Sequence, residues 1–382
     1  MAKQQAVTDI LRQYHPVPDR FDELGTGGSG PKSHWRPLLQ QLNLESVAGL
    51  NLRAQAVSNA IAEDGVTYNV YEDPRGDTRP WEVDLLPLVL GADEWQWLSK
   101  AVAQRAELLD SVLADLYGEQ SLLKEGLMPP ALVYGQAGFQ WPCQGIQPAG
   151  GRFLHLYAVD LARAPDGGWW VMADRTQAPS GAGYALQNRL VISRAFPAPF
   201  HNLPVTNLSE FFQGFQNSLA GMSPAGTESP LCVLLTPGRF NETYFEHVFL
   251  ARYLGLPLVE GQDLTVRDDT VYLKTLQGLR RVHAIYRRLD DGFCDPLELR
   301  ADSVLGIPGL LGAVRAGKVL MANALGSGVL ESAALFGFLP EISKKLLGSP
   351  LAMPSVASWW CGEKPALDYV IEHLDELVIK PA

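Results

Sequence analysis

The stretch HLYAVDLARAPDGGWWVMADRTQAPSGAGYALQNR, residues 155–189, contains two apolar segments separated by PDGG, and each segment carries an aspartate near its outer end. Turn residues between segments rich in Leu, Tyr, Val and Trp predict a β-hairpin. Because the turn lies near residues 166–168, Asp160 and Asp174 fall toward the open end. We therefore expect the two side chains to lie close together across the strands.

A pair of carboxylates in this position has a limited set of chemical explanations. The two groups repel each other unless a cation lies between them or one of them takes up a proton. Hard oxygen ligands suit Mg²⁺, which binds through one or two carboxylates together with substrate phosphates. The ordinary alternative, that either aspartate only ends its strand or caps a turn, stays open at this point.

The segment PSGAGYALQNR, residues 179–189, follows the hairpin directly. Glycine lets backbone N–H groups approach an anion closely, and Arg175 or Arg189 can pair with a phosphate or carboxylate. Asn188 can bind a metal or hydrogen-bond a substrate. The alternatives are a glycine-rich turn and an exposed amide without a function.

Residues 231–260 have the pattern of a βαβ unit. LCVLLTP is a continuous apolar run typical of a buried parallel strand, and PLVEG is a second short strand. Between them we expect a helix that is capped by Asn241 and ends at Gly255. The sequence thus predicts an α/β fold with a parallel sheet in this half of the chain.

A hairpin of LTVRD and TVYLKT and then a single strand, RVHAIYRRLDD, follow the βαβ unit. Arg287 and Arg288 stand at the end of that strand, and ligands of open α/β sheets bind beyond the carboxyl ends of strands. The two arginines are therefore candidate site residues. A solvated charge cluster with internal ion pairs is the alternative. His247 and His283 are interpreted as packing residues rather than general bases.

The remaining segments predict mixed helices and strands. Helices are expected over residues 45–63, 92–117 and 206–221, a strand at VTYNVYED, and a mostly helical region from 302 to about 347. SPAGTESP, residues 223–230, is the best candidate domain boundary. LVIKPA at the end predicts a strand that carries Lys380, and the chain looks incomplete there.

Composition excludes several classes of function. The 382 residues are 47% hydrophobic and 19% charged, with a formal net charge of −11, so nucleic acid is not expected as a partner. No apolar run is long enough for a membrane span. The four cysteines are scattered, which disfavours a zinc site or a disulfide framework and fits a cytoplasmic protein. Cys361, in WWCGE, has no histidine partner motif for a nucleophilic role.

Taken together, these motifs resemble the circularly permuted ATP-grasp family (type 2), related to the synthetase domain of glutathionylspermidine synthases. The resemblance extends over nearly the whole chain and is carried by GVTYNVY, RPWEVDLLP, DLYGEQ, the 160–189 stretch, LLTPGRFNETYFEH, LVEGQDLTV, YRRLDDGFCDP, LGIPGLL, NALGSGVLES and VIKPA. It implies three parts: residues 1–222 as a helical region with the metal-bearing half, 230–300 as the α/β domain that precedes the grasp, and 301–382 as a helical segment with the start of a nucleotide-binding lobe.

The resemblance also implies site residues. Asp160 and Asp174 match the two acids that hold Mg²⁺ on nucleotide phosphates, with Thr176 or Gln177 near the place of a third ligand. Phosphate contacts are implied for Arg163, Arg175 and Lys380. Asn188 and Arg189 are the candidate substrate-binding residues.

The implied activity is that of an ATP-dependent carboxylate–amine ligase, with ATP and Mg²⁺ as cofactors and Arg287 and Arg288 as the catalytic contacts to the substrate carboxylate or acylphosphate. The expected substrates are small or peptide-like molecules with a carboxylate and an amine, and a helical domain or downstream segment is a possible partner. The competing hypothesis is a non-catalytic fragment or degenerate relative that binds a peptide or a partner chain.

Overall fold

The computed structural model describes residues 14–25, 30–42, 47–69, 78–226 and 228–381. At its centre lies the predicted hairpin, formed by β3 (Ala158–Arg163) and β4 (Trp169–Arg175), which pair antiparallel. The segment 354–356 extends this sheet, because the backbone of Val171 bonds to Pro354 and Val356 at 2.9 Å each. The hairpin prediction is confirmed.

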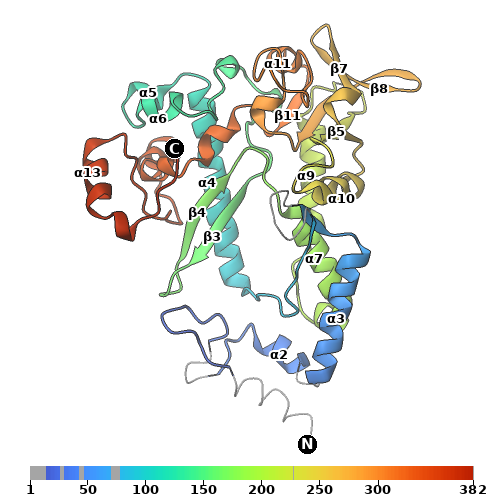
Figure 1. Ribbon diagram of the computed structural model, residues 1–382, viewed down its shortest axis with the longest axis vertical. Helices are drawn as coiled ribbons and strands as arrows, with labels where there is room; N and C mark the ends of the chain where they lie inside the picture. The colour runs from blue at the N-terminus through green and yellow to red at the C-terminus, as the bar shows by residue number, and fades with distance from the viewer. Residues whose placement is uncertain (1–13, 26–29, 43–46, 70–77, 227, 382) are drawn as a thin grey trace, which may run out of the picture.

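One long helix supports the hairpin from behind. α4 (Ala92–Leu116) crosses the back of β3 and β4 (Figure 1), and its buried stripe includes Leu108, Val112 and Leu116. Acidic residues in its first turn suit the positive end of the helix dipole. Three shorter helices lie around its C-terminal half: α5 (Ser121–Lys124), α6 (Pro130–Tyr134) and α12 (Leu339–Leu347).

A four-stranded parallel sheet forms the second structural centre, with strand order β11-β10-β5-β6. Its strands are β5 (Cys232–Leu235), β6 (Leu258–Val259), β10 (Ala284–Arg287) and β11 (Leu320–Ala322). α10 (Tyr244–Leu254) connects β5 to β6 and ends at Gly255, whose φ is 65°. The βαβ unit and its C-terminal glycine are therefore confirmed, although the helix cap is Thr243 rather than Asn241.

Helices cover both faces of this sheet. α9 (Ser209–Met222) and α10 pack on one face, and α11 (Leu310–Arg315) packs on the other, where the core continues into that of α4. The predicted division into residues 1–222, 230–300 and 301–382 stays a prediction, and the sheet draws elements from beyond both ends of the middle part. α9 precedes residue 223 but shares the sheet's core, and β11 lies beyond residue 300 but pairs with β10.

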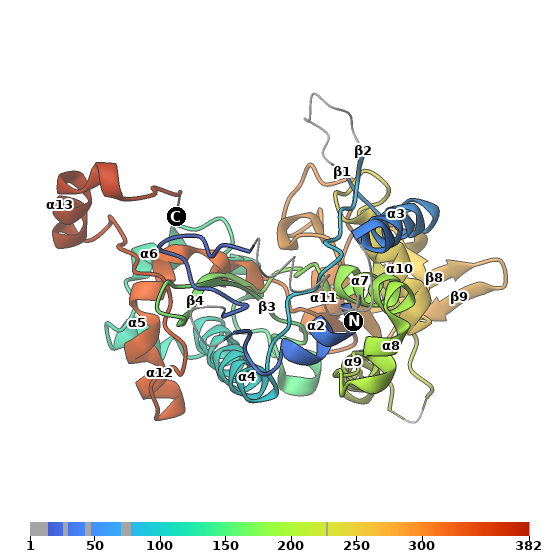
Figure 2. The same cartoon turned by 90° about the horizontal axis from the view of Figure 1, so that it is seen from below.

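A separate antiparallel sheet projects from the parallel sheet (Figure 2) and consists of β7 (Leu264–Arg267), β8 (Thr270–Thr275) and β9 (Gly278–Arg281). Asp268 and Asp269 form the β7–β8 turn with φ of 49° and 54°, the conformation of a tight hairpin turn. The strand predicted for RVHAIYRRLDD is formed, but it is shorter than predicted and covers only residues 284–287 as β10. Arg281 ends β9, and the chain then enters the parallel sheet as β10.

The N-terminal elements pack against α7 (Ala182–Ala195) and α8 (Pro197–Asn202) in a third, smaller core. They are α2 (Arg36–Leu42), α3 (Val47–Glu63) and β1 (Thr67–Asn69), and β2 (Thr78–Pro80) pairs with β1. The first half of the predicted strand VTYNVYED contains β1, and its second half, residues 70–73, lies outside the described residues. No helix among the described residues is long and apolar enough to cross a membrane.

The C-terminal part is less helical than predicted. α13 (Lys364–Glu372) stands apart from the body of the molecule (Figures 1 and 2). Residues 377–381 are irregular and residues 378–381 are exposed, so the strand predicted for LVIKP is not formed; no described strand pairs with this segment. Short 3-10 helices occur along the whole described chain. They are η1 (Trp141–Cys143), η2 (Ala149–Gly151), η3 (Gly261–Asp263), η4 (Asp291–Phe293), η5 (Ser327–Glu331), η6 (Ala333–Gly337) and η7 (Leu374–Glu376).

Candidate functional site

The candidate site lies where the carboxyl edge of the parallel sheet meets the open end of the hairpin. Three neighbouring strands end at this edge and are followed by Thr236, Arg288 and Asn323. The loop 176–181, between β4 and α7, lies on the same edge, because Arg288 donates to the carbonyl of Pro179. Carboxyl ends of parallel strands are where open α/β sheets bind ligands.

Asn323 joins the hairpin to the sheet. Its Oδ1 accepts from the backbone N–H groups of His155 and Leu156 at 2.7 and 2.9 Å. Its Nδ2 donates to the carbonyls of Leu156 and Thr176 at 2.6 and 2.7 Å. All four hydrogen bonds available to the amide are used, at a side chain that is 2% exposed. One residue thus holds both ends of the hairpin, and the sequence analysis did not identify it.

Arg287 is fully enclosed, and its three guanidinium nitrogens bond to protein groups. Its Nε donates to the carbonyl of Asn323 at 2.8 Å, and its Nη1 to that of Leu289 at 2.9 Å. Its Nη2 contacts Ser327 and forms an ion pair with Asp291 at 2.5 Å. Burial raises the pKa of Asp291 above its ordinary value, although the adjacent guanidinium of Arg287 partly offsets this effect. The structure therefore places Arg287 in the framework of the site.

Arg288 is also committed to protein groups. Its Nη2 pairs with Oε2 of Glu246 at 3.2 Å, and both side chains are almost fully buried. Oε1 of Glu246 accepts the N–H groups of Gly181 and Gly183 at 2.7 and 2.8 Å. A carboxylate at this position suits the positive N-terminal end of α7. The pair holds the 176–181 loop on the sheet, which sequence reasoning did not anticipate.

His247 is held neutral beside this pair. Its Nδ1 lies 2.9 Å from Oγ1 of Thr236, and its Nε2 lies 3.1 Å from Oγ1 of Thr243. Burial, with the nearby charge of Arg288, lowers the pKa of His247 to about 2. His283 accepts from the N–H of Leu231 through its Nδ1. The interpretation of both histidines as packing residues agrees with these contacts.

The depressed pKa of His247 makes stability depend on pH. Below about pH 6.5 the unfolded chain binds a proton that the native chain does not, so stability is lost as the pH falls. We expect wild-type protein to lose about 2 kcal/mol more than His247→Asn between pH 7 and pH 5, measured by urea unfolding. The exposed His201→Asn variant should follow the wild type, and an equal loss in all three proteins would contradict the expectation.

The two aspartates of the hairpin point to opposite faces, which corrects the expectation that they meet. Asp174 pairs with Val159 and Asp160 pairs with Ala173, and residues paired across antiparallel strands share a face. The register shifts by one residue between Asp160 and Leu161. Without this bulge Asp174 would pair with Ala158, on the same face as Asp160. The bulge turns it inward instead.

The surroundings of the two carboxylates differ accordingly. Asp174 is 1% exposed and receives two bonds from Arg105, both at 2.7 Å, and one from the hydroxyl of Tyr157 at 2.5 Å. Asp160 has a side chain that is 51% exposed and pairs with Arg175 at 2.7 Å on the outer face. These two residues do not fit a shared Mg²⁺ ion.

The side chains considered for a third metal ligand are engaged as well. Thr176 donates its hydroxyl to the carbonyl of Ser327 at 2.7 Å, and Gln177 accepts from the N–H of Asp291 at 2.7 Å. Glu331 accepts the backbone N–H groups of both residues. Within the described ranges, no group of three or more His, Cys, Asp or Glu side chains is arranged to hold a metal ion.

The other predicted contacts are dispersed over the structure. Arg163, near the hairpin turn, lies between the rings of Phe21 and Trp169 and pairs with Glu23 and Glu94. Arg163 therefore lies at the turn end of β3, away from the open end of the hairpin.

Asn188 and Arg189 lie on α7 and make structural contacts. Asn188 accepts from the indole of Trp81 at 2.8 Å, and Arg189 donates to the carbonyl of Thr206 at 2.8 Å. Lys380 is exposed in the irregular C-terminal segment. The structure does not bring these three residues together with Arg175.

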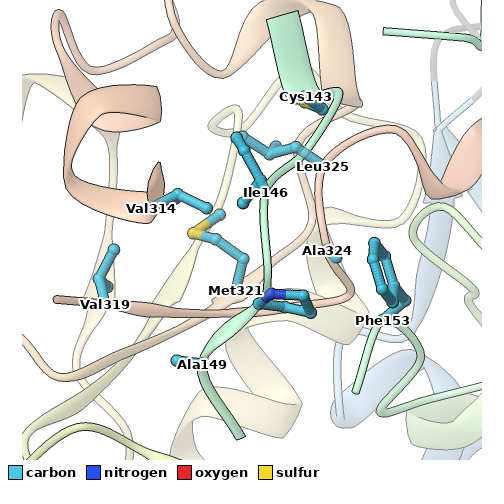
Figure 3. Close-up of a pocket in the computed structure, with 10 residues that line it drawn as sticks. Cys143, Ile146, Ala149, Phe153, Val314, Val319, Met321, Ala324 and Leu325 are labelled. Carbon is cyan, nitrogen blue, oxygen red and sulfur yellow. The ribbon is translucent and has the colours of Figure 1, made fainter. Parts of the chain in front are cut away.

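A small apolar cavity lies beside the site rather than in it. It measures about 10 Å³ and is lined by side chains that include Cys143, Phe153 and Met321 (Figure 3). This volume admits one water molecule at most. Burial raises the pKa of the Cys143 and Cys294 thiols to about 12, so neither is a ready thiolate.

Fold and site together define an α/β protein in which a hairpin is joined to the carboxyl edge of a parallel sheet. The chain belongs to the circularly permuted ATP-grasp type 2 family, whose model matches residues 87–382. Membership of this family supports an ATP-dependent, ligase-like activity in general terms.

Several proteins resemble the chain. An uncharacterized protein of Synechocystis sp. is 37% identical over 97% of this chain and 77% of its own length. Two uncharacterized proteins of Mycobacterium tuberculosis are 38% and 35% identical over 94% of this chain, which spans 42% and 65% of their lengths. A glutathione synthetase-like effector from Globodera pallida, in its apo form, has a similar fold, with a TM-score of 0.53 at 12% identity over 87% of this chain and 79% of that chain.

Proposed function

We propose that the protein is an ATP-dependent carboxylate–amine ligase that acts on a peptide-like or amino-acid-like substrate through an acylphosphate. The observation that carries this proposal is the family match over residues 87–382. The likeness of fold to a glutathione synthetase-like effector agrees with peptide-like chemistry. ATP-grasp enzymes generally use ATP together with Mg²⁺.

The proposed reaction has two balanced steps. A substrate carboxylate oxygen attacks the γ-phosphorus of ATP, the bond to the β,γ-bridging oxygen breaks, and an acylphosphate and ADP result. The amine nitrogen then attacks the acyl carbon, phosphate leaves, and the amine gives up a proton as the amide forms. The protein contributes alignment and positive charge at the transferring phosphoryl group.

Arg175 is the strongest candidate for a phosphate contact on the outer face of the hairpin. Its side chain is 52% exposed and lies at the open end, beside the 176–181 loop. Arg287 and Arg288 are enclosed, so we propose that they support the loops that border the site. Lys380 stays a proposed phosphate contact, although it lies in the exposed C-terminal segment and not at the open end of the hairpin.

If Arg175 contacts phosphate, Arg175→Gln should weaken ATP binding about tenfold or more, since a charge-assisted hydrogen bond contributes about 1.5–3 kcal/mol. Calorimetric titration of ATP with Mg²⁺ measures this change. Arg280→Gln, at an exposed arginine of β9, is the matched control and should bind like the wild type. Equal affinity in both variants would remove Arg175 from the phosphate site.

The ligase reaction is tested by trapping its intermediate. The protein is incubated with ATP, Mg²⁺, hydroxylamine and pools of amino acids or dipeptides, and hydroxamate and ADP are measured. Hydroxamate that requires both ATP and a particular carboxylate is the expected result. ADP formation that no carboxylate stimulates would contradict the proposal.

A second candidate is a peptide- or partner-binding module without catalysis. It is favoured by the engagement of Arg287, Arg288 and Asp174 with protein groups, which leaves few free charges at the site. Binding of peptides that neither requires nor hydrolyses ATP would favour this candidate over the ligase.

A further inference from the structure

A buried cluster of three polar side chains lies beneath the hairpin. The guanidinium of Arg105, on α4, donates from Nε and Nη2 to the two oxygens of Asp174 at 2.7 Å each. The Tyr157 hydroxyl donates to Oδ1 of the same carboxylate at 2.5 Å. Arg105 and Asp174 are 2% and 1% exposed, and Arg105 also lies over the ring of Phe336 at 5.2 Å.

This cluster satisfies the charge of Asp174 within the protein. Arginine stays protonated at all accessible pH values, and its fork matches a carboxylate in two parallel bonds. A metal ion at Asp174 would have to displace that guanidinium and leave it buried without an anion. Removing one partner of a buried pair is strongly unfavourable. The carboxylate is therefore not available to a cation shared with the outer face.

The cluster also fixes the start of the loop that borders the site. Asp174 is followed directly by Arg175, Thr176 and Gln177, and the N–H groups of the last two donate to Glu331 at 2.7 and 2.8 Å. From there the chain reaches Pro179, whose carbonyl Arg288 holds. The bond from Arg105 to Asp174 thus links α4 to the beginning of the 176–181 loop.

We propose that Asp174 is a positioning residue that anchors the 176–181 loop to α4 through Arg105, and that Asp160 and Asp174 do not share a metal ion. Asp160 lies on the opposite face and has Arg175 as its counter-charge. This inference deepens the proposed ligase function, because it assigns the loop as the part of the site that the buried cluster orders. It rests on that function only for the role of the loop.

The test compares four variants with the wild type by Mn²⁺ electron paramagnetic resonance, thermal unfolding and hydrogen exchange. They are Asp160→Asn, Asp174→Leu, the triple variant R105M/Y157F/D174L, and Leu219→Ala, a core change in α9. Asp174→Leu should lower the unfolding midpoint by about 5 °C or more, and the triple variant should recover most of it.

Two readouts separate positioning from general destabilisation and from metal binding. Exchange at residues 176–183 should rise in Asp174→Leu beyond that in Leu219→Ala, and fall again in the triple variant. The triple variant should bind Mn²⁺ with the same affinity as the wild type. If the wild type does not bind Mn²⁺ at all, this result also contradicts a metal site shared by Asp160 and Asp174. A tenfold loss of Mn²⁺ affinity in both Asp160→Asn and the triple variant would overturn the inference, as would unchanged exchange in Asp174→Leu. Failure of ligation alone would affect only the ligase proposal, because neither readout uses ATP.

Discussion

Replacing Arg287 with methionine is expected to lower the free energy of unfolding by about 3–5 kcal/mol, the range for a buried ion pair that loses one partner. Arg287 is fully buried, and its loss leaves the Asp291 carboxylate enclosed without a cation. It also removes the donors that hold the carbonyls of Leu289 and Asn323. Methionine is chosen because it fills a similar volume and adds no new charge. Urea unfolding at pH 7 measures the change.

Two further variants distinguish this structural role from contact with a substrate. Arg280→Met, at an exposed position of β9, should change the free energy of unfolding by less than about 0.5 kcal/mol. Adding Asp291→Asn to Arg287→Met should restore part of the loss, since the buried charge is then removed. If Arg287→Met unfolds like the wild type, the Arg287 side chain is not held by its protein partners in solution. A ligand contact then becomes the better interpretation.

The elements that sequence reasoning predicted correctly are those whose signals are local. The hairpin around residues 165–168, the βαβ unit and the end of its helix at Gly255 each depend on turn residues and periodicity within a short window. The family was also identified correctly, because many ordered motifs carry it. Local pattern and fold agree at these places.

The side-chain geometry of the site could not be predicted because it depends on one residue of register and on distant partners. The bulge in the hairpin reverses the face of Asp174, and nothing in the spacing of the two aspartates shows it. Their place at a strand end made Arg287 and Arg288 candidate contacts to a substrate, with a solvated charge cluster as the alternative. Several of their partners lie more than thirty residues away in sequence, such as Asn323 for Arg287 and Glu246 for Arg288.

The predicted domain boundaries also depend on a local signal. A linker rich in Pro, Gly and Ser is a local signal, but SPAGTESP connects α9 to a sheet on which α9 itself packs. The strand β11 joins the same sheet from beyond residue 300. Composition marks where the chain turns, whereas the extent of a domain is decided by which apolar faces bury one another.

Gly326→Ala is the second change with a large expected effect, because the loop after β11 leaves no room for a side chain. Gly326 has φ of 89°, and a Cβ atom there would lie 2.2 Å from the hydroxyl oxygen of Tyr117. That hydroxyl is itself fixed, donating to the carbonyl of Gly326 at 3.0 Å and accepting from the N–H of Gln140 at 3.0 Å. Left-handed strain and overpacking together should cost about 2–5 kcal/mol, measured by urea unfolding.

A matched glycine separates the two contributions. Gly145 has φ of 79° but no heavy atom within 4 Å of its would-be Cβ, so Gly145→Ala should lose only the backbone part, about 1–2 kcal/mol. Adding Tyr117→Phe to Gly326→Ala should recover little, because ring carbon Cζ would still lie 2.5 Å from the new methyl group. The next residue, Ser327, accepts hydrogen bonds from the side chains of Thr176 and Arg287. Displacement of this loop should therefore also loosen the hairpin from the sheet. Equal losses in the two alanine variants would mean that Tyr117 moves aside easily and that the loop is not held as tightly as its hydrogen bonds indicate.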